Sequence, residues 1–153
     1  MTAREYFDWI RADVLELAEM EDRVAALNEL SRAPKAQGQG PSGCGSNRAE
    51  PMADRTIDAE LELARMKAQV APELDRACHV LYGRSGRGGV AKARSSADAD
   101  CIFGYYLVGM SWREVADELV RPESKDAKHW CMMRAYRALE YMDRVGMSWL
   151  IDS

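Results

Sequence analysis

The segment from Tyr105 to Val120, YYLVGMSWREVADELV, constrains the fold of this chain more than any other. Its first part is an apolar run that ends at Gly109, and glycine tolerates the positive φ with which many helices stop. Ser111 and Glu114 then stand in the relation of a capping box, which predicts that a new helix starts at Trp112. A helix, a glycine turn and a capped helix in this order are typical of a helix-turn-helix module.

The predicted helix from Trp112 has one apolar face, formed at i, i+3, i+4 and i+7 by Trp112, Val115, Ala116 and Leu119. Pro122 then prevents the helix from continuing. Ser124 is a suitable N-cap for a longer amphipathic helix, which we expect to end or bend at Gly146.

In a helix-turn-helix module the second helix lies in the major groove, so its polar side chains are the candidates for DNA contacts. They are Lys125, Lys128, His129, Arg134 and Arg137. Few of these side chains can make bidentate contacts to guanine or adenine, and Asp126 lies among them. The pattern therefore favours DNA binding more than it favours sequence-specific readout.

The same region resembles a known group of proteins. The pattern YLxGxSWxEVA at 106–116, followed by RALxxM at 137–142, is similar to the region 4 helix-turn-helix of sigma-70-type factors. More narrowly, the chain resembles small phage and prophage proteins, the ArpU-like late transcription regulators. Two further motifs contribute to this resemblance, AREYFDWIR at 3–11 and MAD at 52–54.

The resemblance implies a phage-type transcription regulator that binds double-stranded DNA. The amphipathic N-terminal helices further predict a homodimer, and the scattered cysteines and missing targeting signals predict a cytoplasmic protein. Its N-terminal helices would mediate dimerisation or contact with RNA polymerase. An alternative is a protein-interaction or assembly protein, or a DNA-packaging protein similar to a small terminase. In that alternative the helix-turn-helix does not read a DNA sequence.

The N-terminal half predicts two long helices. In residues 1–32, Thr2 and Glu5 form a capping-box pattern, and an apolar row follows at three- and four-residue steps. This row comprises Ile10, Val14, Leu17, Val24 and Leu27, and Glu21 interrupts it between Leu17 and Val24. Residues 33–51 are rich in glycine and proline and nearly lack large apolar residues, so we expect a flexible linker there.

Residues 52–83 predict the second amphipathic helix, which Pro72 is expected to kink or split. The expected buried edge comprises Ile57, Leu61, Ala64, Ala68, Ala71, Leu74, Cys78 and Leu81. Together the two helices predict an antiparallel hairpin or a coiled-coil arm. The fold class is therefore all-α, with this arm followed by the C-terminal helix-turn-helix module in residues 98–153.

Residues 84–97 predict a basic, glycine-rich loop before the module. Arg84, Arg87, Lys92 and Arg94 are candidates for contacts to DNA phosphates. The alternative for this segment is a solvated linker without a binding role. A phosphate-binding P-loop is excluded, because the pattern GxxxxGK followed by Ser or Thr is missing from the sequence.

Composition narrows the function further. The formal net charge of −4 argues against a protein that coats nucleic acid non-specifically. The four scattered cysteines lack a C-x-x-C pair, and zinc binding by Cys78, His79, His129 and Cys131 has no common spacing, so we expect reduced thiols and no metal or other cofactor. The sequence shows no arrangement typical of an enzyme, no secretory signal and no membrane span.

Overall fold

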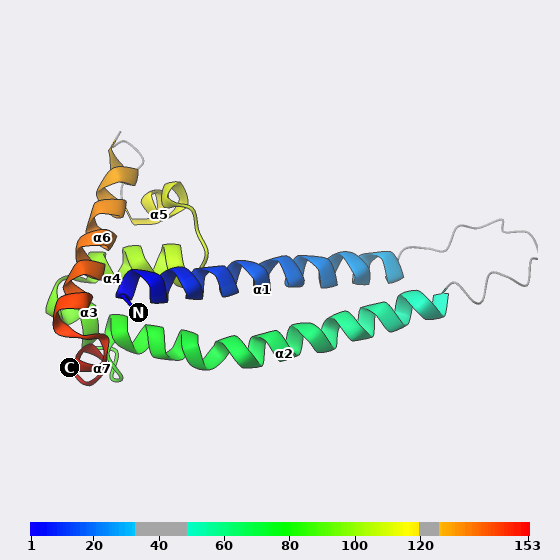
Figure 1. The fold of residues 1–153 in the computed structure, drawn as a ribbon. Helices are drawn as coiled ribbons and strands as arrows, with labels where there is room; N and C mark the ends of the chain where they lie inside the picture. The colour runs from blue at the N-terminus through cyan, green and yellow to red at the C-terminus, as the bar shows by residue number, and fades with distance from the viewer. Residues whose placement is uncertain (33–48, 120–125) are drawn as a thin grey trace, which may run out of the picture. The chain divides into compact units, whose positions relative to one another are not determined.

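A computed structural model describes residues 1–32, 49–119 and 126–153 of the chain (Figure 1). Its elements are α1 (Ala3–Arg32), α2 (Ala49–Tyr82), α3 (Gly89–Ala93), α4 (Ser96–Ile102), the π-helix η1 (Phe103–Leu107), α5 (Trp112–Leu119), α6 (Ala127–Val145) and α7 (Met147–Asp152). The described part of the chain contains helices and no strand, so the all-α class is confirmed. The predicted linker lies outside the described residues up to residue 48, and the last residues assigned to it belong to α2.

The chain forms two compact units. Unit 1 comprises Met1–Leu15 and Val70–Ser153, and unit 2 comprises Glu16–Gln69. Both long helices contribute to each unit, since α1 and α2 each cross the boundary.

The start of α1 is set by local hydrogen bonds, as the capping-box pattern predicted. The backbone N–H of Thr2 donates to Oε2 of Glu5 at 2.7 Å, and the backbone N–H of Glu5 donates to Oγ1 of Thr2 at 3.2 Å. These bonds satisfy two donors that the first helical turn leaves without a partner. The bond from the backbone N–H of Thr2, together with one from Oγ1 of Thr2 to Oε2 of Glu5 at 3.0 Å, lowers the pKa of the Glu5 carboxyl, because both favour its charged form.

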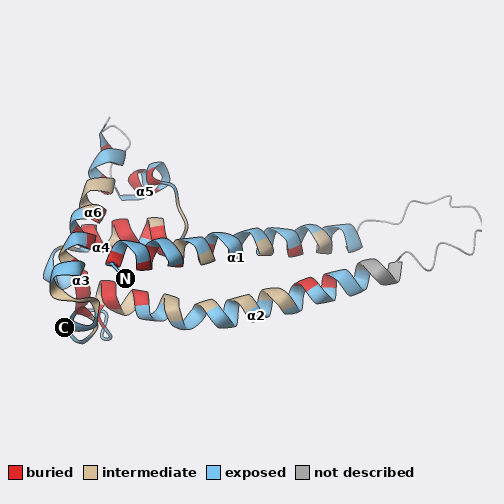
Figure 2. Cartoon of the chain, in the orientation of Figure 1, coloured by how far each residue is buried: buried red, intermediate tan, exposed pale blue. Residues whose placement is uncertain are grey.

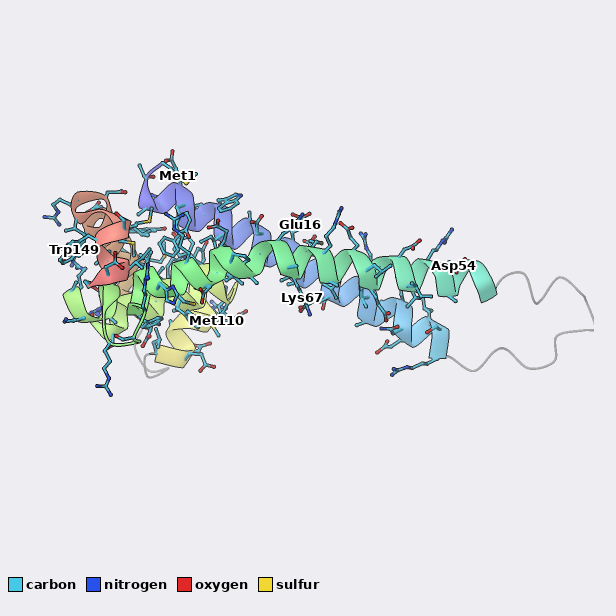
Figure 3. All side chains as sticks on the ribbon, turned by 90° about the horizontal axis from the view of Figure 1, so that it is seen from below. Met1, Glu16, Asp54, Lys67, Met110 and Trp149 are labelled. Carbon is cyan, nitrogen blue, oxygen red and sulfur yellow. The ribbon has the colours of Figure 1, made fainter. Side chains whose placement is uncertain are left out.

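Unit 2 is a pair of helical segments with little buried surface. The Nζ of Lys67 on α2 lies 3.2 Å from Oε1 of Glu21 on α1 (Lys67 is labelled in Figure 3). Val24, Thr56 and Ala59 are buried, whereas most other side chains here are exposed (Figure 2). The core of unit 2 is therefore a single narrow row on each helix.

The predicted buried edge of α2 is confirmed at its end, where Leu81 is buried and Leu74 and Cys78 are half-buried, but it is wrong in unit 2. Ile57 and Leu61 are 54% and 65% exposed, and Ala64 and Ala68 are also exposed. The row that is covered instead comprises Thr56, Ala59, Leu63 and Met66. Both rows repeat at three- and four-residue steps, so periodicity alone did not select between them.

Pro72 does not split α2. The helix runs without interruption from Ala49 to Tyr82 with Pro72 inside it. A proline in a helix removes one backbone donor. The predicted split is therefore wrong, and the alternative, a kink at Pro72, stays a prediction.

Unit 1 holds the main hydrophobic core. Its largest fully buried side chains include Phe7 and Ile10 from α1, Leu81 from α2, Tyr106 from η1 and Met142 from α6. Within it α4 and α5 pack against α6, and α7 packs against α3 and α6. The apolar C-terminal segment therefore folds onto this core, with Leu150 fully buried.

The segment predicted as a basic loop, residues 84–97, is largely ordered. Its first residues form a turn in which the backbone N–H of Gly88 donates to the carbonyl oxygen of Tyr82 at 2.8 Å. Gly89, at φ +62°, then begins α3, and a Cβ there would lie 2.5 Å from the carbonyl oxygen of Val80. Only glycine permits this close approach of two backbone segments. The loop prediction is therefore wrong for residues 89–93 and 96–97, which belong to α3 and α4, whereas residues 84–88 are not helical.

The connection from α4 to α5 contains the glycine turn and the helix cap that the sequence predicted. η1 ends at Leu107, and Gly109 adopts φ +86°. The backbone N–H of Glu114 donates to Oγ of Ser111 at 3.2 Å, and α5 starts at Trp112 as predicted. Trp112, Val115 and Ala116 are buried, but Leu119 is exposed, so the predicted apolar face covers only the first turns of α5.

Candidate functional site

A groove in unit 1 gathers basic and aromatic side chains around the first turn of α4 and one side of α6. Its volume is about 850 Å³. The α3–α4 connection supplies Ala93, Arg94, Ser95 and Asp98, while Asp126 and α6 supply the rest: His129, Trp130, Met133, Arg134, Arg137 and Tyr141.

Asp98 is the centre of one wall of this groove. Its side chain is 5% exposed, and its Oδ2 accepts a hydrogen bond from Nε of Arg94 at 2.8 Å. Its Oδ1 accepts a second hydrogen bond from Nη1 of Arg134 at 2.9 Å. A buried carboxylate is costly unless it is paired and hydrogen-bonded, and here two guanidinium groups fulfil that requirement.

Ser95 links the same wall to the start of α4. Its Oγ accepts the backbone N–H of Asp98 at 3.1 Å, which caps the helix. The same oxygen accepts a hydrogen bond from Nη1 of Arg134 at 3.1 Å. Arg134 of α6 is thereby bonded to two residues at the first turn of α4.

Aromatic rings hold the guanidinium groups from the other side. The Cζ of Arg134 lies 4.3 Å from the ring centroid of Trp130, and that of Arg94 lies 5.5 Å from the ring centroid of Tyr141. Guanidinium groups at these distances are attracted to the faces of aromatic rings. Because two arginines surround one acid, this wall carries a net charge of about +1 by simple charge addition.

The outward side of α6 adds the polar residues His129 and Arg137, with the apolar Met133 between them. His129, Met133 and Arg137 recur at four-residue steps, which places them on one side of the helix. The opposite side is buried, with Cys131, Ala135, Ala138, Leu139 and Met142 in the core. Arg137 and His129 are exposed, and the structure shows no ion pair to either among the described residues.

The structure brings together four of the residues predicted to bind DNA, since Arg94, His129, Arg134 and Arg137 line the groove. Lys128 is exposed at the start of α6 but does not line it. Lys125 lies outside the described residues, as do Ser124 and Pro122. Arg94 and Arg134 are not free cations, because both are hydrogen-bonded to Asp98.

The other predicted phosphate contacts are spread over the surface. Arg84 lies 3.5 Å from Asp152 in an exposed ion pair. Arg87 is exposed in the turn before α3, and Lys92 is exposed on α3. None of the three lines the groove, so they do not form one cluster with Arg94.

Sequence reasoning missed Asp98, Ser95, Trp130 and Tyr141 as parts of this site. Two local signals were present. Ser95 stands three residues before Asp98, which is the spacing between an N-cap side chain and the backbone N–H that donates to it. Arg94 stands four residues before Asp98, which is the spacing of an ion pair on a helix. The approach of Arg134 to Asp98 had no such signal, because the two residues lie on different helices.

The thiols near the groove belong to the core. Cys101 and Cys131 are buried and free, and burial raises the pKa of each thiol above its ordinary value. Thiols in such apolar surroundings are poor nucleophiles. Across residues 1–32, 49–119 and 126–153, no group of three or more His, Cys, Asp or Glu side chains is placed to hold a metal ion.

The described helices also contain no segment that combines the length and apolar character needed to cross a membrane. No protein-family model matches the chain, and no curated protein or solved structure matches it.

Proposed function

We propose that this chain is a DNA-binding transcription regulator of the phage type, in which α5 and α6 act as a helix-turn-helix. In this proposal α5 supports α6, and the outward side of α6 enters the major groove of double-stranded DNA. Unit 2 acts as a helical arm for homodimerisation or for contact with RNA polymerase.

The observation that carries the proposal is the exposed side of α6. Because α5 packs against the buried side of α6, the side with His129, Met133 and Arg137 stays open. Arginine and histidine donate hydrogen bonds to base edges or phosphates, and an apolar side chain such as Met133 suits the thymine methyl group.

The charge distribution supports a local rather than a general affinity for phosphate. The chain carries a formal net charge of −4, yet the lining of the groove holds Arg94 and Arg134 against the acids Asp98 and Asp126. Arg137 adds a further positive charge at the same place. A DNA backbone beside α6 would meet this positive surface, and its contribution to binding would decrease with salt.

A protein-interaction or assembly function is the second candidate. It is favoured by Trp130, which is exposed in the groove beside Met133 and Arg134. Tryptophan, methionine and arginine are enriched where proteins bind one another. A small-terminase-like packaging protein would combine such a surface with DNA contacts.

Gel retardation with a pool of random-sequence duplex DNA at low salt tests the first proposal. We expect Lys128→Glu combined with Arg137→Glu to abolish retardation, since both residues are exposed and neither has an ion pair among the described residues. Arg134 is unsuitable for this test, because its replacement also breaks the contact with Asp98.

The matched control is Arg23→Glu combined with Arg32→Glu, which changes two exposed arginines of unit 2 and alters the net charge equally. Circular dichroism should be unchanged in both variants. Equal retardation by the α6 variant and the control variant would contradict the assignment of α6 to the DNA interface and would favour the protein-interaction function.

A further inference from the structure

The outer side of α2 in unit 2 carries an apolar row that nothing in the described structure covers. Ile57 and Leu61 are more than half exposed, and Ala64 and Ala68 continue the row at the steps 4, 3 and 4. This is the heptad spacing of a coiled-coil seam.

This row lies almost opposite the row that is buried in unit 2. With 3.6 residues per turn, the mean direction of residues 57, 61, 64 and 68 is roughly 150° from that of residues 56, 59, 63 and 66. A surface helix of a monomer normally has one apolar stripe and an opposite polar face. Here α2 has two, which is typical of a helix that packs on both sides.

We infer that this outer row is the dimer interface, where α2 of a second copy of this chain packs antiparallel about a twofold axis between residues 62 and 63. The inference specifies the dimerising arm of the proposed function. It is tested by self-association without DNA, so it stands or fails separately from DNA binding.

The volumes of the row are self-complementary in this register. A twofold axis between residues 62 and 63 places Ile57 of one copy against Ala68 of the other, and Leu61 against Ala64. Each layer then pairs one large with one small side chain, so the helices approach evenly along the seam. A parallel pairing would place Ile57 against Ile57 and Ala68 against Ala68. The two helices would then be far apart at the isoleucine layer and close together at the alanine layer.

The flanking charges are self-complementary in the same register. In an antiparallel pair each flank of the seam faces the same flank of the second helix, because the twofold axis preserves that side. One flank carries Asp58 and Arg65, and the other carries Glu60 and Lys67. Asp58 then meets Arg65 of the second copy, and Glu60 meets its Lys67, each with an axial offset of about 3 Å at 1.5 Å rise per residue.

Both basic residues already have partners within the chain, and these contacts do not prevent the pairing. Arg65 lies 2.6 Å from Glu62, and Lys67 lies 3.2 Å from Glu21. All four side chains are substantially exposed, and exposed pairs of this kind contribute little to stability. The long side chains of Arg65 and Lys67 can therefore reach a second helix.

Sedimentation equilibrium of the full chain is the first test. We expect the wild-type chain to form a concentration-dependent dimer, and Leu61→Glu to raise its dissociation constant by roughly thirtyfold or more, as replacement of an interface hot spot does. Leu30→Glu is the matched control, because Leu30 is an exposed leucine of unit 2 outside this row. A monomeric wild type, or equal effects of the two variants, would overturn the inference.

A charge exchange tests the antiparallel register. Arg65→Asp should weaken the dimer, because it places two acids together on each side of the axis, and Asp58→Arg with Arg65→Asp should restore it. In a parallel dimer Arg65 would instead meet Glu60, so Asp58→Arg would not rescue Arg65→Asp. Failure of the exchange to restore the dimer would overturn the register, and circular dichroism checks that every variant keeps its helix content.

Discussion

The side chains of Asp98 on α4 and Arg134 on α6 meet across the core edge of unit 1, where Nη1 of Arg134 donates to Oδ1 of Asp98 at 2.9 Å. The acid is buried, and Arg94 completes its hydrogen bonding from the other side. The contact couples the position of α6 to the first turn of α4. Two basic residues of the groove, Arg94 and Arg134, therefore hold helices together as well as lining the groove.

Replacement of Asp98 by Ala should therefore destabilise the protein. We expect the free energy of unfolding to fall by about 1–3 kcal/mol, because two arginines lose their charged acceptor but remain partly exposed to water. Urea denaturation measures the change. Asp152→Ala removes an acid from the exposed pair with Arg84 and should alter stability by less than about 0.5 kcal/mol. Equal effects would show that the buried pair is not stabilising.

Substitution of two glycines with positive φ, Gly89 and Gly146, distinguishes the cost of backbone strain from the cost of steric overlap. A Cβ at Gly146 meets nothing within 4 Å, so Gly146→Ala should cost only the strain of its backbone conformation, φ +88° and ψ +131°, about 1–3 kcal/mol. A Cβ at Gly89 would lie 2.5 Å from a backbone oxygen, so Gly89→Ala should cost clearly more. Thermal denaturation of the two variants tests the order, and a reversed order would contradict the close packing of α2 against α3.

The C-terminal helix α7 should contribute to the stability of unit 1. Leu150 is fully buried, and its replacement by Ala should lower the free energy of unfolding by about 2–5 kcal/mol. Trp149→Ala, at a neighbouring residue that is 55% exposed, should change it by less than about 0.5 kcal/mol. If Trp149→Ala were the more damaging variant, the apolar tail would be covered by a partner instead of by the core.

Alkaline pH should destabilise the protein through buried phenols. Burial raises the pKa of the Tyr6 hydroxyl from 10.0 to about 12, and the carboxylate of Glu73 adds to the rise. The folded state thus holds this proton more tightly than the unfolded state. The resulting stability is complete below pH 10 and is lost as the pH rises toward about 12.

Tyr6→Phe removes this ionisation, so its free energy of unfolding should fall less steeply than that of the wild type between about pH 10 and pH 12. Urea denaturation at a series of pH values measures the two slopes. The variant keeps a residual slope, because burial also raises the pKa of Tyr82 and Tyr106. Identical slopes in the two proteins would contradict the burial of the Tyr6 hydroxyl.

Part of the candidate site was predictable. The sequence indicated α6 and four of the polar residues that line the groove, because helix periodicity and residue type are visible in a single segment. It did not indicate that Arg94 and Arg134 are bound to Asp98, since a polar side chain that becomes buried looks the same in sequence as one that stays exposed. The assignment of α5 and α6 to a DNA-binding module stays a prediction.

By itself, the sequence determined the all-α class and the ends of several helices. The caps at Thr2 and Ser111 and the stops at Gly109 and Gly146 depend on hydrogen bonds and φ angles within a few residues, so local chemistry is sufficient for them. Only the tertiary structure decided which apolar row of α2 is covered, and that residues 89–93 form a helix. Burial depends on segments distant in the chain, and two rows of equal periodicity are distinguished only by the helix that packs against one of them.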